Sequence, residues 1–138
     1  MNLQDYTLNS VKKFSFEGNE VNAKCVKVYD GDSITVIFSI FNLPHMQYNI
    51  RLYNIDTAEI RSKNEEEKIK ALEAKKIVSD LILNKVIKLK LKEFDKYGRI
   101  LAEVYCDGIN CDISSYLYDK KLGYRYDGGS KDKQFFKK

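Results

Sequence analysis

Residues 21–40 read VNAKCVKVYDGDSITVIFSI, and this stretch decides the fold. Apolar side chains crowd its first part up to Val28, and in its second part Ile34, Val36, Phe38 and Ile40 recur at every second position. Between the two parts stands Asp30-Gly31-Asp32-Ser33, a combination of residue types typical of tight turns. Two runs that alternate with a period of two and are joined by a short turn predict a β-hairpin.

The chain continues with a third strand and then a helix. Residues 42–45 contain the only proline and predict a turn, and residues 48–55 predict a strand that ends at Ile55. From Ser62 to Asn84 the apolar period changes to three and four residues, which predicts one amphipathic helix. Ser62 followed by Glu65 matches a capping box at its start.

Two more strands and a short helix complete the pattern. Residues 86–92 alternate apolar side chains with lysines, residues 100–106 predict a fifth strand, and residues 113–121 predict a second helix. Five short strands with a helix after the third fit a closed barrel, because closure leaves few strand edges unpaired. We therefore expect an α+β fold, mainly β: a five-stranded OB-fold barrel with one long helix after strand three and a short C-terminal helix.

Length and composition indicate a single domain. The 138 residues, 43% hydrophobic and 32% charged, are typical of one globular unit. We expect the barrel domain over residues 21–129, an N-terminal extension over residues 1–20 that is either an edge strand or a tail, and a polar tail over residues 130–138. The net charge of +4 is too small to identify a polyanionic partner.

The first residues and the cysteines bear on location. The start lacks the basic and apolar regions of a signal peptide, and no apolar run approaches the roughly 20 residues of a membrane span. Three scattered cysteines argue against a disulfide framework, and a single histidine argues against zinc. We expect an intracellular, soluble monomer that needs neither a membrane nor an obligate protein partner.

Three polar segments remain after the turns and strands have been assigned. They are Asp30-Gly31-Asp32-Ser33, then Arg51 with Asp56-Thr57-Ala58-Glu59, then Asp95-Lys96-Tyr97-Gly98-Arg99. Each alone is also typical of an ordinary surface turn. Together, in this order and with the long helix between the second and third, they resemble the signature segments of the staphylococcal nuclease family over about residues 22–127.

The residue types suit phosphodiester hydrolysis. Extra negative charge develops on the phosphate oxygens in that reaction, so a site needs a cation, donors aimed at those oxygens and a group that positions water. Asp32 and Asp56 supply hard oxygen ligands, which favour Ca²⁺ or Mg²⁺ over zinc. The rigid guanidinium forks of Arg51 and Arg99 suit a phosphate.

The resemblance implies a role for each residue. Asp32, Asp56 and the main-chain carbonyl of Thr57 would bind Ca²⁺, and Glu59 would be the general base beside Arg51 and Arg99. The neighbouring nucleotide would be bound by Lys96, Tyr97 and Tyr126. Tyr124 competes with Tyr126 for one family position, and the following Asp127-Gly128-Gly129 favours Tyr126.

This chain departs from the family pattern in several places. Ser33 replaces a threonine and Ala58 a proline, which loosens the loop that carries Asp56. The hairpin between Asp32 and Arg51 is longer than in the type member, so its tip at residues 42–45 can reshape substrate access. Fewer residues follow Tyr126 than that member's final helix needs.

The resemblance implies a calcium-dependent nuclease that cuts DNA and/or RNA with little sequence preference and leaves 3′-phosphate ends. One alternative is a noncatalytic OB-fold module that binds single-stranded nucleic acid, and another is a protein-interaction domain on the same barrel. The retained acids and arginines distinguish these hypotheses, because a pure binder has no need of two carboxylates beside a phosphate.

Overall fold

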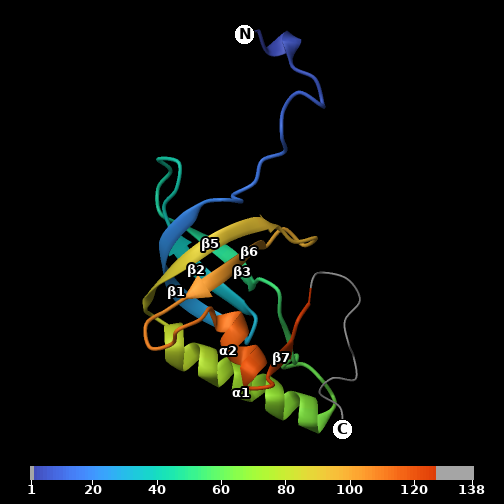
Figure 1. The fold of residues 1–138 in the computed structure, drawn as a ribbon, viewed down its shortest axis with the longest axis vertical. Coiled ribbons are helices and arrows are strands. Elements are labelled where there is room, and N and C mark those ends of the chain that lie inside the picture. The colour runs from blue at the N-terminus through green and yellow to red at the C-terminus, as the bar shows by residue number, and fades with distance from the viewer. Residues whose placement is uncertain (1, 127–138) are drawn as a thin grey trace.

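The computed structural model describes residues 2–126 of the chain (Figure 1). Within these residues the backbone forms a barrel, two α-helices and a small second sheet. The elements are η1 (Leu3–Asp5), β1 (Glu20–Asp30), β2 (Ser33–Phe38), β3 (Met46–Leu52), β4 (Asp56–Thr57), α1 (Glu65–Ile82), β5 (Val86–Phe94), β6 (Ile100–Tyr105), α2 (Ile113–Asp119) and β7 (Gly123–Tyr124).

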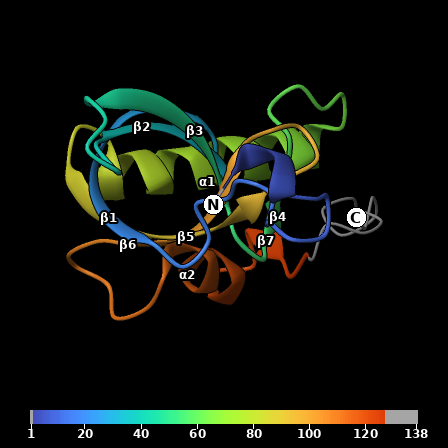
Figure 2. The same ribbon diagram turned by 90° about the horizontal axis from the view of Figure 1, so that it is seen from above.

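Five strands close into a barrel in the order β1, β2, β3, β6, β5, with β5 pairing back to β1 (Figure 2). The antiparallel pairing of β1 with β2 and of β2 with β3 confirms the predicted hairpin and third strand. A parallel contact joins β3 to β6 from Ile50 and Ile100 onward. The closed barrel with its two helices confirms the predicted mainly-β OB-fold.

Alternation along the strands builds the core. Every second residue of β2 faces inward and is buried, and β5 buries Ile87, Leu89 and Leu91 while its lysines lie on the other face. Complete burial of one such side chain stabilises the fold by about 1.5–3 kcal/mol. The largest fully buried side chains are Phe38, Ile50, Leu52, Ile55, Ile82, Leu89, Leu91, Ile113, Leu117 and Leu122.

Helix α1 packs Ala74 and Val78 against the barrel core and Ala71 against Ala58. Ala71, Ala74 and Val78 are buried at the three- and four-residue spacing that the sequence predicts. The predicted start at Ser62 is wrong, because Asn64 caps the helix by accepting a hydrogen bond from the N–H of Glu67 at 2.9 Å. Ser62 instead accepts a bond from the N–H of Asn64 at 3.1 Å and so shapes the turn before the cap.

A second sheet, formed by β4 and β7, is not predicted by the sequence pattern. The predicted third strand ends too late, since β3 stops at Leu52 and Asn54 turns the chain with a φ of 66°. The chain then enters β4, where Asp56 pairs with Tyr124 and Thr57 with Gly123. Residues near the C-terminus of the described chain therefore lie beside the segment that follows β3 (Figure 2).

The segment before β1 is an arm that leaves the end of the barrel (Figure 1). Phe14 and Phe16 do not form the strand that their alternation allowed, but Phe16 is buried and anchors the arm. The predicted tail over residues 130–138 lies outside the described residues. In residues 2–126 no helix has the length and apolar character needed to cross a membrane.

Candidate active site

The turn between β1 and β2 brings Asp32 to the mouth of a cleft. Asp30 and Ser33 pair across the hairpin, so Gly31 and Asp32 form its loop. Gly31 is required by close packing, because a Cβ there would lie 2.7 Å from the Cβ of Ala74 and 3.2 Å from Oγ1 of Thr57. The turn is thus fixed against α1 and β4, and Asp32 with it.

Arg51 lies opposite Ser33 on β3 and contacts two aspartates. Its Nη1 lies 3.0 Å from Oδ2 of Asp32 and its Nη2 lies 2.9 Å from Oδ1 of Asp56. Burial by itself lowers the pKa of this guanidinium, but the charges and hydrogen bonds of the two carboxylates outweigh burial and raise the pKa. All three side chains are buried, so removal of one partner would leave an uncompensated charge.

Strand β4 carries Asp56 and Thr57 to the same place. The backbone N–H of Thr57 donates to Oδ2 of Asp32 at 3.1 Å. Oδ2 of Asp56 accepts a hydrogen bond from the hydroxyl of Tyr124 at 2.6 Å. The β4–β7 ladder therefore holds Asp56 from both its backbone and its side chain.

The two C-terminal tyrosines have different partners. Tyr124 contacts Asp56, whereas the ring of Tyr126 has its centre 5.5 Å from Cζ of Arg51. The sequence alone treats them as competitors for one role, and the structure places both at the site.

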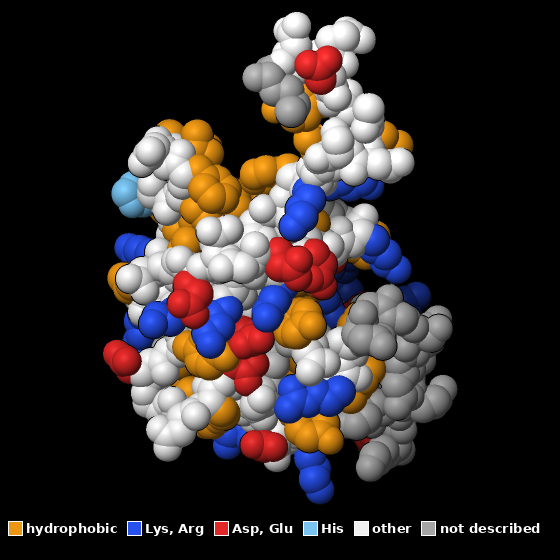
Figure 3. All heavy atoms as spheres, turned by 45° about the horizontal axis from the view of Figure 1, so that its top comes forward, with side chains coloured by type: hydrophobic (Ala, Val, Ile, Leu, Met, Phe, Trp, Pro, Cys, Tyr) orange, Lys and Arg blue, Asp and Glu red, His pale blue; other side chains and the backbone are white. Residues whose placement is uncertain are grey.

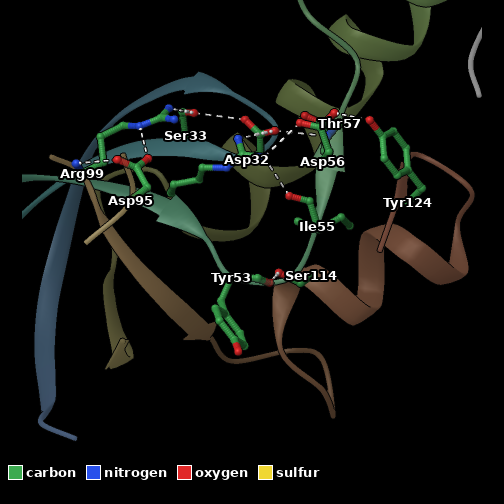
Figure 4. A network of polar contacts seen from close by, with 11 residues as sticks. Asp32, Ser33, Tyr53, Ile55, Asp56, Thr57, Asp95, Arg99, Ser114 and Tyr124 are labelled. Carbon is green, nitrogen blue, oxygen red and sulfur yellow. Dashed lines mark hydrogen bonds and ion pairs between the residues drawn. The ribbon is translucent and has the colours of Figure 1, made fainter. Parts of the chain in front are cut away.

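Arg99 is held by its own turn between β5 and β6. Asp95 accepts hydrogen bonds from the N–H groups of Tyr97 and Arg99, and also from Nε of Arg99 at 2.7 Å. Nη1 of Arg99 donates to Oγ of Ser33 at 3.3 Å, and that hydroxyl donates to Oδ1 of Asp32 at 3.0 Å. One network of polar contacts thus runs from Asp95 to Tyr124 through the β1–β2 turn (Figure 4).

The predicted site residues line two adjoining hollows. A cleft of about 920 Å³ is lined by Asp32, Arg51, Asp56, Thr57, Glu59 and Arg99. A cavity of about 340 Å³ beside it is lined by Lys96, Tyr97 and Tyr126, and shares Arg51 and Arg99 with the cleft. Glu59, Lys96 and Tyr97 are exposed, in contrast to the buried aspartates and Arg51. The structure therefore brings all nine predicted residues to one side of the barrel.

Four residues outside the predicted set of nine also contact this site: Asp30, Ser33, Asp95 and Tyr124. Asp30, Ser33 and Asp95 stand inside the conspicuous motifs, so their positions were available in the sequence. Tyr124 was available in the sequence only as a competitor of Tyr126, and its bond to Asp56, which joins residues 68 positions apart, had no local signal.

The oxygen atoms of the cleft fit a hard cation. Oδ1 of Asp30 and Oγ1 of Thr57 are buried with no hydrogen-bond partner among the described residues. Burial, and then the charge of Asp32, raises the pKa of Asp30, which lines the same cleft. In the described chain no group of three or more His, Cys, Asp and Glu side chains is arranged to hold a metal ion. Carbonyl and water oxygens would therefore complete a shell begun by Asp32 and Asp56.

Comparison with known proteins identifies the family. A search of curated proteins gave no match. The family described as Staphylococcal nuclease homologue matches residues 49–127, which is more than half of the chain. This match includes Arg51, Asp56, Glu59 and Arg99, and the hydrogen bonds above attach the preceding Asp32 to the same site. The chain belongs to the staphylococcal nuclease homologue family.

Proposed function

We propose that this nuclease-like protein hydrolyses phosphodiester bonds of DNA and/or RNA in a Ca²⁺-dependent reaction with little sequence preference, leaving 3′-phosphate ends. Family membership supports a nucleic acid as the substrate. The observation that carries the proposal is the network in which Arg51 and Arg99 meet Asp32 and Asp56 at one cleft. Separated acids and arginines would not serve one phosphate.

Arg51 and Arg99 are the groups that would bind the phosphate. Each guanidinium lines both hollows and is held in place by a carboxylate, Arg51 by two aspartates and Arg99 by Asp95. Fixed donors stabilise charge that develops on phosphate oxygens without reorganising during the reaction. The hydrogen bonds that the two arginines donate would therefore stabilise the transition state more than the bound substrate.

Asp32, Asp56 and the carbonyl of Thr57 would hold the Ca²⁺ ion. When bound, the cation supplies positive charge to the phosphate oxygens and acidifies water. The hydrogen bonds from Ser33, Thr57 and Tyr124 orient the two carboxylates toward the cleft. These hydrogen bonds support the assignment of the two carboxylates as ligands.

Glu59 would act as the general base. It follows β4 by two residues and lines the cleft with an exposed side chain, so a water molecule in the cleft can reach it. Lys96, Tyr97 and Tyr126 would bind the neighbouring nucleotide in the adjoining cavity, through a charge, a hydroxyl and a ring.

A metal-by-substrate cleavage assay tests the proposal. Plasmid DNA, denatured DNA and RNA are incubated with the protein and Ca²⁺, Mg²⁺ or chelator, and the ends of the products are identified. We expect cleavage with Ca²⁺, none with chelator, and 3′-phosphate ends. Intact substrate under every metal and pH, with binding retained, would support the noncatalytic binder instead.

Two substitutions separate the roles within that assay. Glu59→Gln is expected to lower kcat by about 10²–10⁴-fold with little change in substrate affinity, as for loss of a general base. Asp56→Asn is expected to weaken Ca²⁺ binding in a calorimetric titration. Asp119→Asn, an exposed change on α2, is the matched control and should leave both quantities unchanged.

A further inference from the structure

An aromatic cluster covers the end of the barrel from which the N-terminal arm emerges. It consists of Phe14, Phe16, Phe38, Phe41, Tyr48 and Phe94, whose neighbouring ring centroids lie 4.2–6.4 Å apart. Phe16 and Phe38 are buried, but Phe14 is 64%, Phe41 53% and Phe94 37% exposed. We call these three exposed rings the aromatic patch. Hydrophobic side chains gather in this part of the surface, between the hairpin tip and the arm (Figure 3).

Packing of the core alone does not explain why these rings are exposed. Phe41 stands at the tip of the long β2–β3 hairpin with a φ of 57°, a left-handed conformation that is unfavourable for a bulky residue. In that conformation its ring stacks on Phe16 at an interplanar angle of 7° and a distance of 5.9 Å. Backbone strain of this kind is retained where surrounding structure enforces it, and it clusters at ligand-binding positions.

The patch is continuous with the cavity of the candidate active site. Phe94 lines that cavity together with Tyr97 and Arg99, and its ring lies 6.2 Å from Phe14. Phe94 therefore joins the two arginines that would bind the phosphate to the exposed rings of the arm and hairpin.

Positive charge accompanies the rings along this route. Nζ of Lys96 lies 5.3 Å from the ring centre of Tyr97 in the cavity wall. Nζ of Lys92, which also pairs with Glu103 at 3.3 Å, lies 5.3 Å from the ring centre of Tyr53 in the same wall. Exposed Lys12 and Lys13 directly precede Phe14 at the other end. Rings interleaved with lysines are typical of surfaces that bind single strands, where bases stack and phosphates pair with cations.

We propose that the aromatic patch is a binding site for unpaired bases of the substrate strand where it leaves the cavity. The proposal rests on the nucleic-acid substrate of the proposed function and adds a contact for the strand outside the cavity. Bases in a duplex present their faces to one another, so they cannot stack on Phe14 or Phe41 without unpairing. The lysines favour this occupant over a second copy of the chain, which carries the same positive charges.

A binding measurement with chelator present tests the patch independently of catalysis. A fluorescent DNA single strand of about 12 nucleotides, a duplex of the same sequence and a dinucleotide are titrated with the wild type and with Phe14→Leu/Phe41→Leu. Leucine keeps the apolar area but removes the ring faces. We expect the variant to bind the long strand about tenfold or more weakly, with the dinucleotide unaffected. Tyr118→Leu, which removes an exposed ring from α2, is the control and should change nothing.

The outcomes are distinguishable. Unchanged affinity of the double variant for the long strand, with a native circular dichroism spectrum, would overturn the proposal. The proposal would also be overturned if the wild type sediments as a dimer, the double variant sediments as a monomer, and both bind the strand equally well. The patch would then join two copies of the chain. If the strand binds through the patch but no metal supports cleavage, the patch stands and the hydrolase proposal fails.

Discussion

Tyr124 donates its hydroxyl to Asp56 at 2.6 Å while pairing with the same residue through the β4–β7 ladder. A group that donates a hydrogen bond to a metal ligand orients that ligand, and its loss commonly costs 10- to 100-fold in metal affinity or activity. We expect Tyr124→Phe to weaken Ca²⁺ binding by about tenfold and to lower the free energy of unfolding by about 1–3 kcal/mol. Calorimetric titration with Ca²⁺ and urea unfolding measure the two effects.

Tyr118→Phe is the control for that substitution. Tyr118 is an exposed residue of α2, so removal of its hydroxyl should leave Ca²⁺ affinity unchanged. Equal Ca²⁺ affinities of wild type and Tyr124→Phe would show that the hydrogen bond does not position Asp56.

Tyr105 and Glu103 form a second close pair, on the outer face of β6. The hydroxyl of Tyr105 donates to Oε1 of Glu103 at 2.6 Å, and this hydrogen bond is the main cause that raises the pKa of Tyr105 to about 12. The same bond, and then Lys92, lowers the pKa of Glu103.

The raised pKa of Tyr105 predicts a stability effect at alkaline pH. The folded state holds the phenol proton more tightly than the unfolded state, whose phenol titrates near pH 10. The stabilisation is therefore complete below about pH 10 and is lost as pH rises toward about 12. The difference in unfolding free energy between wild type and Tyr105→Phe should decline over that window. In Glu103→Gln, the Tyr105 pKa read from labelled-tyrosine NMR should fall toward 10; a pKa still near 12 would contradict the assignment.

The sequence located the residues of the site better than their partners. Asp32, Arg51, Asp56 and Arg99 stand in recognisable segments, and the barrel brings those segments together. The bonds that fix them join distant positions, as Arg99 to Ser33 across 66 residues and Tyr124 to Asp56 across 68. Such pairs depend on how the strands finally pack, and a local sequence pattern does not predict that packing.

Close packing of the β1–β2 turn on α1 gives a further prediction. A methyl group at position 31 would meet the Cβ of Ala74 at 2.7 Å, so either the turn or the helix must shift. We expect Gly31→Ala to lower the free energy of unfolding by about 1–3 kcal/mol, the usual cost of overpacking. It should also lower cleavage, because the displaced turn carries Asp32.

A double-mutant cycle tests the cause of that effect. Ala74→Gly alone should cost about 1 kcal/mol through lower helix propensity. In the presence of Gly31→Ala it removes the clashing Cβ, so the double variant should be more stable than the sum of the two single effects predicts. Additive effects in urea unfolding would place the strain elsewhere.

The strands and helices were predictable wherever a period extended over several residues. β2 and β5 follow their alternation, and α1 buries the predicted apolar face. β4 and β7 are only two residues long, so they contain no period, and Ile55 was assigned to the strand before it. The helix start was missed because Ser62 and Asn64 are both good caps and only the packed turn chooses between them.

The whole protein has a modest net charge of +4, so the salt dependence of strand binding should come from local contacts with phosphate. We expect log K for a single strand to fall linearly with log salt. Lys96→Gln should reduce the slope by about 1, since Lys96 lines the cavity. Lys68→Gln, an exposed change on α1, should leave the slope unchanged. Equal slopes for all three proteins would remove Lys96 from the phosphate path.

The ladder between β4 and β7 also sets when the cleft becomes complete. A ribosome releases the chain from its N-terminus, so Gly123 and Tyr124 emerge after all five barrel strands. A nascent chain that still lacks these two residues can close its barrel, but β4 then has no strand to pair with. The carboxylate of Asp56 also receives no hydrogen bond from the hydroxyl of Tyr124. Hydrolytic competence is therefore expected only after Gly123 and Tyr124 have left the ribosome and paired with β4.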